Sequence, residues 1–303
     1  MKTKIKTSCH SISAVACSGA FLAGAILLVA SGAKAQNLYA TYNNKIYEFT
    51  PSGSQSTFVS PGFGNRLAFD SEGDLFMGQN STILEFTPGG SQSTFTTVAG
   101  ASTGLAFNSA GDLFEDDHNG NIFEYTPGGV QSTFATGLSQ PEGIAFNSAG
   151  DLFVSGGNQQ GYIYEYTPGG AQSTFTTAVD NPVGLAFNSA GILFEADYDT
   201  GNIYEFTSSG VRSTFATGMS NVGSLAFNSA GDLFASTLSN IYEFTPNGNE
   251  SIFAPGVDAN GLAFAGLALP VPEPSEFGLL ACGLVALAAF HLKKNRTVLR
   301  PIS

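Results

Sequence analysis

The chain has 303 residues, with 11 lysines and arginines against 24 aspartates and glutamates, which gives a formal net charge of −13. Between residues 36 and 270 only three basic residues stand against 22 carboxylates, so nucleic acids and anionic membrane surfaces are poor partners for this segment. All three cysteines lie outside it, which excludes a disulfide framework, a thiolate metal site and a cysteine nucleophile there. The content of 26 Phe, 10 Tyr and 37 Gly, with no Trp, indicates an all-β chain with many tight turns.

The first 35 residues have the three parts of a secretory signal peptide. Three lysines lie within the first six residues, an apolar run covers residues 19–30, and Ala33 and Ala35 form the A-x-A pattern that signal peptidase accepts. The mature chain is therefore expected to begin at Gln36. A lipoprotein processed at Cys17 is the alternative, and it fits less well because this cysteine precedes most of the apolar run.

The body of the chain, residues 36–270, repeats three short words six times each, which is the signature of a repeat architecture. The first word, Leu-Ala-Phe or a near copy, ends at Phe69, Phe107, Phe146, Phe187, Phe227 and Phe264. The second, Ser-Thr-Phe or Ser-Ile-Phe, ends at Phe58, Phe95, Phe134, Phe175, Phe215 and Phe253. The third places a glutamate between aromatic or apolar neighbours, at Glu48, Glu85, Glu124, Glu165, Glu205 and Glu243.

Each repeat predicts four short strands joined by tight turns. In the unit from Gly143 to Thr176, β-prone words at 144–146, 152–154, 163–166 and 173–175 alternate with turn residues. Gly150 and Gly170 end two of these connections, at positions where a hairpin needs a positive φ. Each unit is therefore expected to be a four-stranded antiparallel meander.

The two ends of the body favour a closed ring over a linear solenoid. The first unit begins at its second strand, residues 37–39, and the last unit stops after its first strand, residues 262–264. Joined, these pieces complete one blade and leave no unpaired edge. The sequence thus predicts a six-bladed β-propeller of four-stranded antiparallel blades, closed by a C-terminal strand in the first blade.

The repeat resembles the NHL-type propeller repeat, whose spacing and glycine placement match residues 141–154. That resemblance supports the fold but not one activity, because propellers of this kind include receptors, scaffolds, lyases and lactonases.

Residues 271–303 form a tail with three distinct parts. Pro272-Glu273-Pro274 is followed by an apolar stretch over residues 277–292, expected to be a transmembrane helix, and by a basic cluster that would hold it on the cytoplasmic side, Lys293, Lys294 and Arg296. This order resembles a PEP-CTERM sorting signal, which implies export by the general secretion route and removal of the tail near the Pro-Glu-Pro motif by an exosortase. The extra residues 297–303 depart from that pattern.

Two loops and one set of strand residues carry polar groups without a clear catalytic pattern. His118 follows Glu115, Asp116 and Asp117, and a matching acidic word begins at Glu195. We interpret both words as solvated loops between the second and third strands, with Ca²⁺ as a possible ligand, although neither has the spacing of a known calcium loop. The six repeated glutamates are interpreted as solvent-facing or hairpin-bonded carboxylates.

The residues that enter the innermost strands are the better candidates for a site, because they border the mouth of the central channel. Two positions before each Leu or Ile of the first word stand Asn65, Thr103, Glu142, Val183, Gly223 and Asn260. Of these, Glu142, Asn65 and Asn260 resemble part of the divalent-metal set of the gluconolactonase-like propellers. The axial aspartate that this family implies as partner and base is missing from these positions.

We therefore expect an exported β-propeller at the cell surface or in the extracellular matrix. Its expected role is a binding or scaffold module for polysaccharide or surface proteins, without a catalytic residue or a cofactor. Its transient partners would be signal peptidase and the exosortase, and its link to the membrane would be the C-terminal helix before processing. The alternative is a metal-dependent gluconolactonase-like hydrolase or lyase.

Overall fold

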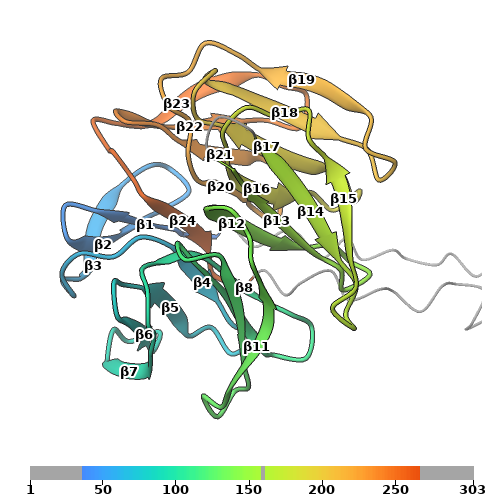
Figure 1. The fold of residues 1–303 in the computed structure, drawn as a ribbon. Helices are drawn as coiled ribbons and strands as arrows, with labels where there is room; N and C mark the ends of the chain where they lie inside the picture. Colours follow the sequence, from blue (N-terminus) through green and yellow to red (C-terminus); the bar gives the residue numbers. More distant parts are fainter. Residues whose placement is uncertain (1–35, 158–160, 267–303) are drawn as a thin grey trace, which may run out of the picture. The chain divides into compact units, whose positions relative to one another are not determined.

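The computed structural model describes residues 36–157 and 161–266, which form six four-stranded antiparallel sheets around a common centre (Figure 1). The predicted all-β six-bladed propeller is thereby confirmed. In each sheet the strands follow one another from the centre outwards in sequence order, except in the first.

Blade 1 contains β24 (Gly261–Phe264), β1 (Leu38–Tyr42), β2 (Lys45–Phe49) and β3 (Gln55–Val59). Blade 2 contains β4 (Leu67–Phe69), β5 (Leu75–Gly78), β6 (Thr82–Phe86) and β7 (Gln92–Thr97). Blade 3 contains β8 (Ser102–Phe107), β9 (Leu113–Asp117), β10 (Asn121–Tyr125) and β11 (Gln131–Thr136).

Blade 4 contains β12 (Pro141–Phe146), β13 (Leu152–Gly156), β14 (Tyr162–Tyr166) and β15 (Gln172–Thr176). Blade 5 contains β16 (Pro182–Phe187), β17 (Leu193–Asp197), β18 (Asn202–Phe206) and β19 (Arg212–Ala216). Blade 6 contains β20 (Leu225–Phe227), β21 (Leu233–Ser236), β22 (Asn240–Phe244) and β23 (Glu250–Pro255).

Side-chain capping explains why the repeated turns form. In the β12–β13 hairpin, Asn147 Oδ1 accepts hydrogen bonds from the backbone N–H groups of Ala149 and Asp151, and Gly150 adopts a φ of 90°. In the β14–β15 hairpin, Gly170 has a φ of 81° and donates its N–H to the carbonyl of Thr167. Asparagine and glycine are the residues these geometries favour, so the turn chemistry sets the hairpins.

Aromatic rings, mostly of phenylalanine, pack between neighbouring blades. Phe114 of β9 packs edge-on against Phe134 in its own blade and against Phe146 in blade 4, with ring centroids 5.1 and 5.0 Å apart. The same pair of contacts recurs around the ring, centred on Tyr39, Phe76, Phe153, Phe194 and Phe234. Such edge-on pairs contribute beyond simple burial, so the Phe-rich words form the core of the ring.

The ring closes between the two ends of the described chain. Strand β24 pairs antiparallel with β1, and Leu38 lies opposite Phe264. Gln36 joins the same region, because its side chain donates to the carbonyl of Ala265 and accepts from the backbone N–H of Ser229. Residues 36–266 thus contain all the strands of the six sheets, so no strand of these sheets pairs with a segment outside this range.

Several predicted features lie outside the described residues. These are the signal peptide with Ala33 and Ala35, the Pro272–Pro274 motif, the apolar segment 277–292 and the basic cluster from Lys293 to Arg296. Within the described ranges there is no helix with the length and apolar character needed to cross a bilayer.

Candidate functional site at the polar mouth of the channel

The six residues that enter the innermost strands meet around one cavity. Asn65, Thr103, Glu142, Val183, Gly223 and Asn260 all line a hollow of about 260 Å³ at one end of the channel. Loop residues from blades 5, 6 and 1 complete its wall, among them Tyr198, Asn221, Thr237 and Asp258. We call this hollow the polar mouth, because amides, hydroxyls and carboxylates dominate its lining.

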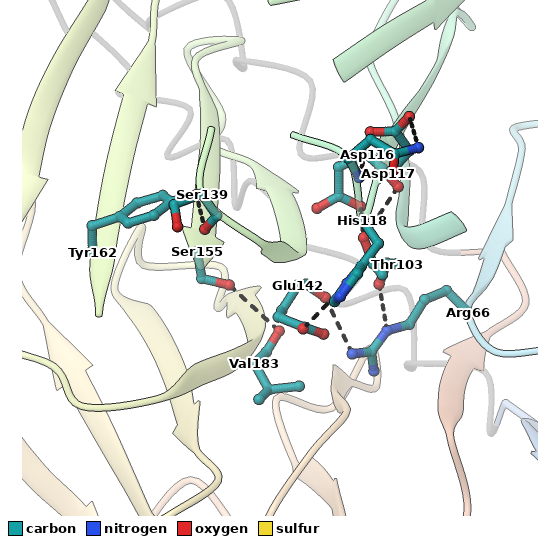
Figure 2. Close-up of polar contacts among 11 residues, drawn as sticks. Arg66, Thr103, Asp116, Asp117, His118, Ser139, Glu142, Ser155, Tyr162 and Val183 are labelled. Carbon is teal, nitrogen blue, oxygen red and sulfur yellow. Dashed lines mark hydrogen bonds and ion pairs between the residues drawn. The ribbon is translucent and has the colours of Figure 1, made fainter. Parts of the chain in front are cut away.

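Arg66 lines the polar mouth and connects four blades; Figure 2 shows its bonds to Thr103 and Glu142. Arg66 precedes β4, and its guanidinium donates to three backbone carbonyls: Nε to Thr103 at 2.7 Å, Nη1 to Asn260 at 2.9 Å and Nη2 to Glu142 at 3.1 Å. A guanidinium carries five N–H donors, so two remain available after these bonds. The fork of donors is thus used to join blades 1, 3 and 4 to blade 2.

The other blades carry small residues where blade 2 carries Arg66. These are Gly104, Gly143, Gly184, Ser224 and Gly261. Neighbouring innermost strands approach so closely here that a Cβ on Gly143 would lie 2.2 Å from the carbonyl oxygen of Val183. The small residues therefore permit the close approach of the strands around the single arginine.

Two carboxyl groups, those of Asp116 and Glu142, interact with the charge of the guanidinium. Asp116 in β9 is completely buried, and its Oδ1 accepts a hydrogen bond from Thr103 Oγ1 at 3.3 Å. Burial raises the pKa of Asp116 to about 7, although the positive charge of Arg66 opposes this shift. Burial likewise raises the pKa of Glu142, against the charges of Arg66 and His118. Arg66 therefore favours the ionised form of both carboxyls.

His118 reaches the edge of this group. Its Nδ1 lies 3.9 Å from Oε1 of Glu142, and its side chain is 51% exposed (Figure 2). The expected solvated loop before it is wrong: Glu115, Asp116 and Asp117 belong to strand β9 and are at most 1% exposed.

The matching acidic word in blade 5 is also buried. Glu195 and Asp197 lie in strand β17 with 0% exposure. The other blades place Ala40, Met77, Val154 and Ala235 at the position of Glu115 and Glu195, all of them buried. The second strand of blades 3 and 5 therefore continues through the acidic residues. Backbone pairing with the neighbouring strands outweighs the preference of these residues for a loop.

The third-strand glutamates lie where a hairpin partner can bond them. Glu85 accepts a hydrogen bond from Ser93, Glu124 from Ser132 and Glu205 from Ser213. Glu48 instead accepts from Asn37 and Tyr39. These carboxylates therefore stabilise individual blades and stand apart from the channel.

The donor set of the polar mouth does not fit a divalent metal. The three candidate ligands, Asn65, Glu142 and Asn260, do lie together, but Arg66 bonds the backbone carbonyls of two of them and places a positive charge among them. Among the described residues no three His, Cys, Asp or Glu side chains gather in a way that could hold a metal ion. A hard cation prefers several anionic oxygens, whereas here burial raises the pKa values of Asp116 and Glu142 and a guanidinium lies beside them.

No protein-family model and no curated protein sequence matches this chain. Solved structures do match it. A proposed gluconolactonase aligns with a TM-score of 0.59 at 18% identity, over 68% of this chain and 83% of that one. Virginiamycin B lyase from Staphylococcus aureus aligns with a TM-score of 0.58 at 18% identity, over 73% of this chain and 84% of that one. A protein of unknown function from Bacteroides caccae aligns with a TM-score of 0.59 at 15% identity, over 76% and 99%.

What these proteins share with the chain is the fold. At such identities the likeness extends to the six-bladed propeller and not to an activity.

Sequence reasoning located the six mouth positions but missed the two groups that organise them. Arg66 is one of only three basic residues in the segment 36–270 and takes a place that is Gly or Ser in every other repeat, so aligning the repeats would have identified it. Asp116 was named in the acidic word before His118 but was assigned to a solvated loop, whereas it lies in β9, the second strand of its blade.

Proposed function

We propose that this chain is a binding propeller whose polar mouth accepts a neutral, hydroxyl-rich ligand of the carbohydrate class without a metal. The observation that carries the proposal is Arg66, which lines the cavity and whose guanidinium bonds the backbone of three blades. With the positive charge built into the protein, the remaining side chains are suited to hydrogen bonding with hydroxyl groups.

The lining supports this ligand class. Asn65 and Asn260 offer amides that both donate and accept, Asn221 offers its amide oxygen while its Nδ2 donates to the carbonyl of Tyr198, and Tyr198 adds a ring. The volume of about 260 Å³ lies just below the usual range for drug-sized ligands, about 300–1,000 Å³. A single sugar unit, or the end of a polysaccharide chain, suits this size.

A glycan and polysaccharide screen on residues 36–266, followed by calorimetric titration of the best ligand, tests the proposal. We expect Asn260→Ala to weaken binding about tenfold, because its exposed side chain lines the cavity. Asn249→Ala removes an exposed amide from the β22–β23 turn, outside the lining of the polar mouth, and should leave the affinity unchanged.

A chelator should not change the affinity for the sugar. Lactone hydrolysis or elimination that requires a divalent metal and is lost in Glu142→Ala would contradict the proposal and establish the hydrolase or lyase alternative.

We further propose that the chain is exported and sorted to the cell surface, with signal peptidase and an exosortase as its processing partners. The signal-peptide pattern and the tripartite tail support this. Gln36, the expected first residue of the mature chain, is held by Ala265 and Ser229, so processing at both ends would leave the ring complete. Intact mass of the protein from its native envelope should show Gln36 as first residue and no residues beyond the Pro272–Pro274 motif; a bulk population ending at Ser303 would contradict tail removal.

A further inference from the structure

The end of the channel opposite the polar mouth is lined mainly by apolar side chains. Each innermost strand runs away from the polar mouth through the word Leu-Ala-Phe or a near copy. Its first residue contributes to a ring of aliphatic side chains around a hollow of about 70 Å³ next to Arg66, formed by Leu67, Leu105, Ile144, Leu185, Leu225 and Leu262. Its last residue contributes to a ring of aromatic side chains farther along, formed by Phe69, Phe107, Phe146, Phe187, Phe227 and Phe264.

A cavity of about 450 Å³ opens inside the aromatic ring. We call it the apolar funnel; its wall consists of the six phenylalanines with Leu105, Ile144, Leu185 and neighbouring alanines, and its rim includes Asn188, Ser189 and Asn228. No charged side chain contributes to the lining among the described residues. This absence is notable in a segment, residues 36–270, that carries 22 carboxylates.

The funnel is larger than the polar mouth and is preformed. Phe107 and Phe187 are half-buried, and each is held edge-on by a ring of the preceding blade, with centroids 5.0 Å from Phe76 and Phe153 respectively. Aromatic surfaces fixed in this way lose little conformational entropy when a ligand covers them. A cavity of this volume, mostly apolar with a few polar groups at its edge, has the properties of a small-molecule site.

The absence of charged side chains from the lining of the apolar funnel favours a neutral ligand over a charged one. An anionic molecule would find no cation in the lining and would enter a strongly acidic protein, so its burial would be unfavourable. A cationic molecule would find no carboxylate in the lining to pair with. A neutral molecule avoids both costs and can place an acceptor against Nδ2 of Asn188, whose Oδ1 accepts from two N–H groups of its own turn.

We propose that the apolar funnel is a second binding site, specific for a neutral apolar small molecule with ring or chain carbons against the phenylalanines. It is independent of the function proposed for the polar mouth, because the aliphatic ring and Arg66 separate the two cavities.

A matched pair of fluorescent probes tests this proposal on residues 36–266. Phenylnaphthylamine is neutral, and anilinonaphthalene sulfonate adds a sulfonate to the same ring system. We expect saturable binding of the neutral probe at one site per chain, with at least about tenfold weaker binding of the sulfonate. Equal affinities for the two probes, or no saturable binding of the neutral one, would overturn the proposal.

Two tryptophan substitutions in identical turns locate the site. Ser189→Trp places a large side chain on the rim of the funnel, and we expect it to weaken binding of the neutral probe about tenfold. Ser148→Trp makes the same change in the same Asn-Ser-Ala-Gly word of blade 4, at an exposed residue outside the funnel lining, and should leave the affinity unchanged.

Sedimentation equilibrium accompanies the titrations. We expect a monomer for the wild type and for both variants. Equal losses in the two variants would place the probe elsewhere and overturn the proposal. A wild-type dimer that Ser189→Trp dissociates would show that a second copy of the chain covers the funnel, and this too would overturn it.

Discussion

Arg66 is the residue that connects the polar mouth to the stability of the ring. Its three hydrogen bonds reach backbone carbonyls on three other blades, and the buried carboxyl of Asp116 and the half-buried one of Glu142 lie close enough to be affected by its charge. Arginine keeps its charge even where burial lowers its pKa, as it does here. One side chain therefore supplies both the cross-links and the counter-charge for the channel.

Replacing this arginine should destabilise the propeller. Arg66→Met keeps much of the side-chain volume, removes three charge-assisted hydrogen bonds and leaves Asp116 without its counter-charge, so we expect the free energy of unfolding to fall by about 3 kcal/mol. Arg212→Met, at an exposed arginine stacked on Tyr204, is the matched control and should cost less than about 1 kcal/mol. Urea unfolding of both variants measures the difference; equal losses would show that the position of Arg66 has no special role.

Glu115 should make the stability fall as the pH rises. Its carboxyl group is buried next to the hydroxyl of Ser102 without a hydrogen bond of good geometry, and burial, with the charges of Asp116 and Asp117, raises its pKa from 4.5 to about 8 although Ser102 opposes the shift. The folded state therefore holds a proton that the unfolded state releases, so the contribution is complete below pH 4.5 and is lost as the pH rises through about 8. The buried Asp116, with a pKa raised to about 7, acts in the same direction.

The test is the pH dependence of urea unfolding between pH 4.5 and 8.5. Glu115→Met introduces the residue that blade 2 carries at this position, Met77, and should flatten the wild-type decline by a few kcal/mol across this range. Glu72→Gln alters an exposed carboxylate and should leave the slope as it is. A Glu115→Met profile parallel to the wild type would contradict a buried, neutral Glu115.

At the scale of the element, one glycine in each outer hairpin fixes the turn between the third and fourth strands. Gly170 has a φ of 81° and donates its N–H to the carbonyl of Thr167, whose hydroxyl accepts from the N–H of Ala171. The pairing of the third and fourth strands also contains a register shift, which in blade 4 falls between Ile163 and Tyr164 of β14. Each hairpin is thus specified by contacts within its own blade.

Adjacent glycines in this turn should respond differently to alanine. Gly170→Ala forces a side chain into the left-handed region and should cost about 1 kcal/mol. Gly169→Ala adds a Cβ whose only neighbour within 4 Å is Thr167 Oγ1 at 3.9 Å, so it should be neutral or slightly stabilising. Thermal unfolding of the two variants compares them, and an equal effect would show that the turn tolerates a side chain at both positions.

At the scale of the whole molecule, closure makes six similar blades a single structure. Phe253 of β23 contacts Phe49 of β2, Phe234 of β21 contacts Phe264 of β24, and β24 pairs with β1. Blade 6 is thereby joined to blade 1 by the kind of aromatic contact that joins the other neighbours. A ring joined in this way has no terminal repeat that could unfold alone.

Removing the closing strand should therefore affect the entire ring. A chain of residues 36–260 lacks β24, exposes an edge of β1 and loses Leu262 and Phe264 from the core. We expect a thermal transition at least about 10 °C lower and much less cooperative than that of residues 36–266. An unchanged transition would contradict closure by β24.

Local information in the sequence was sufficient for the fold and for the positions of the polar mouth. Turn residues and apolar words act over a few residues and predict the hairpins, while the count of repeats from one end of the segment to the other predicts the number of blades and the closing strand. The same counting placed Asn65, Glu142 and Asn260 at one mouth of the channel, where the structure brings them together.

Only the tertiary structure decided what the channel contains. The hydrogen bonds of Arg66 join residues separated by 37, 76 and 194 positions, and no local pattern specifies such contacts. The acidic word Glu115-Asp116-Asp117 has the composition of a loop, yet strand pairing with β8 and β10 buries it. Ring closure brings distant segments together and excludes water, and this sets the charge and pKa values at the site.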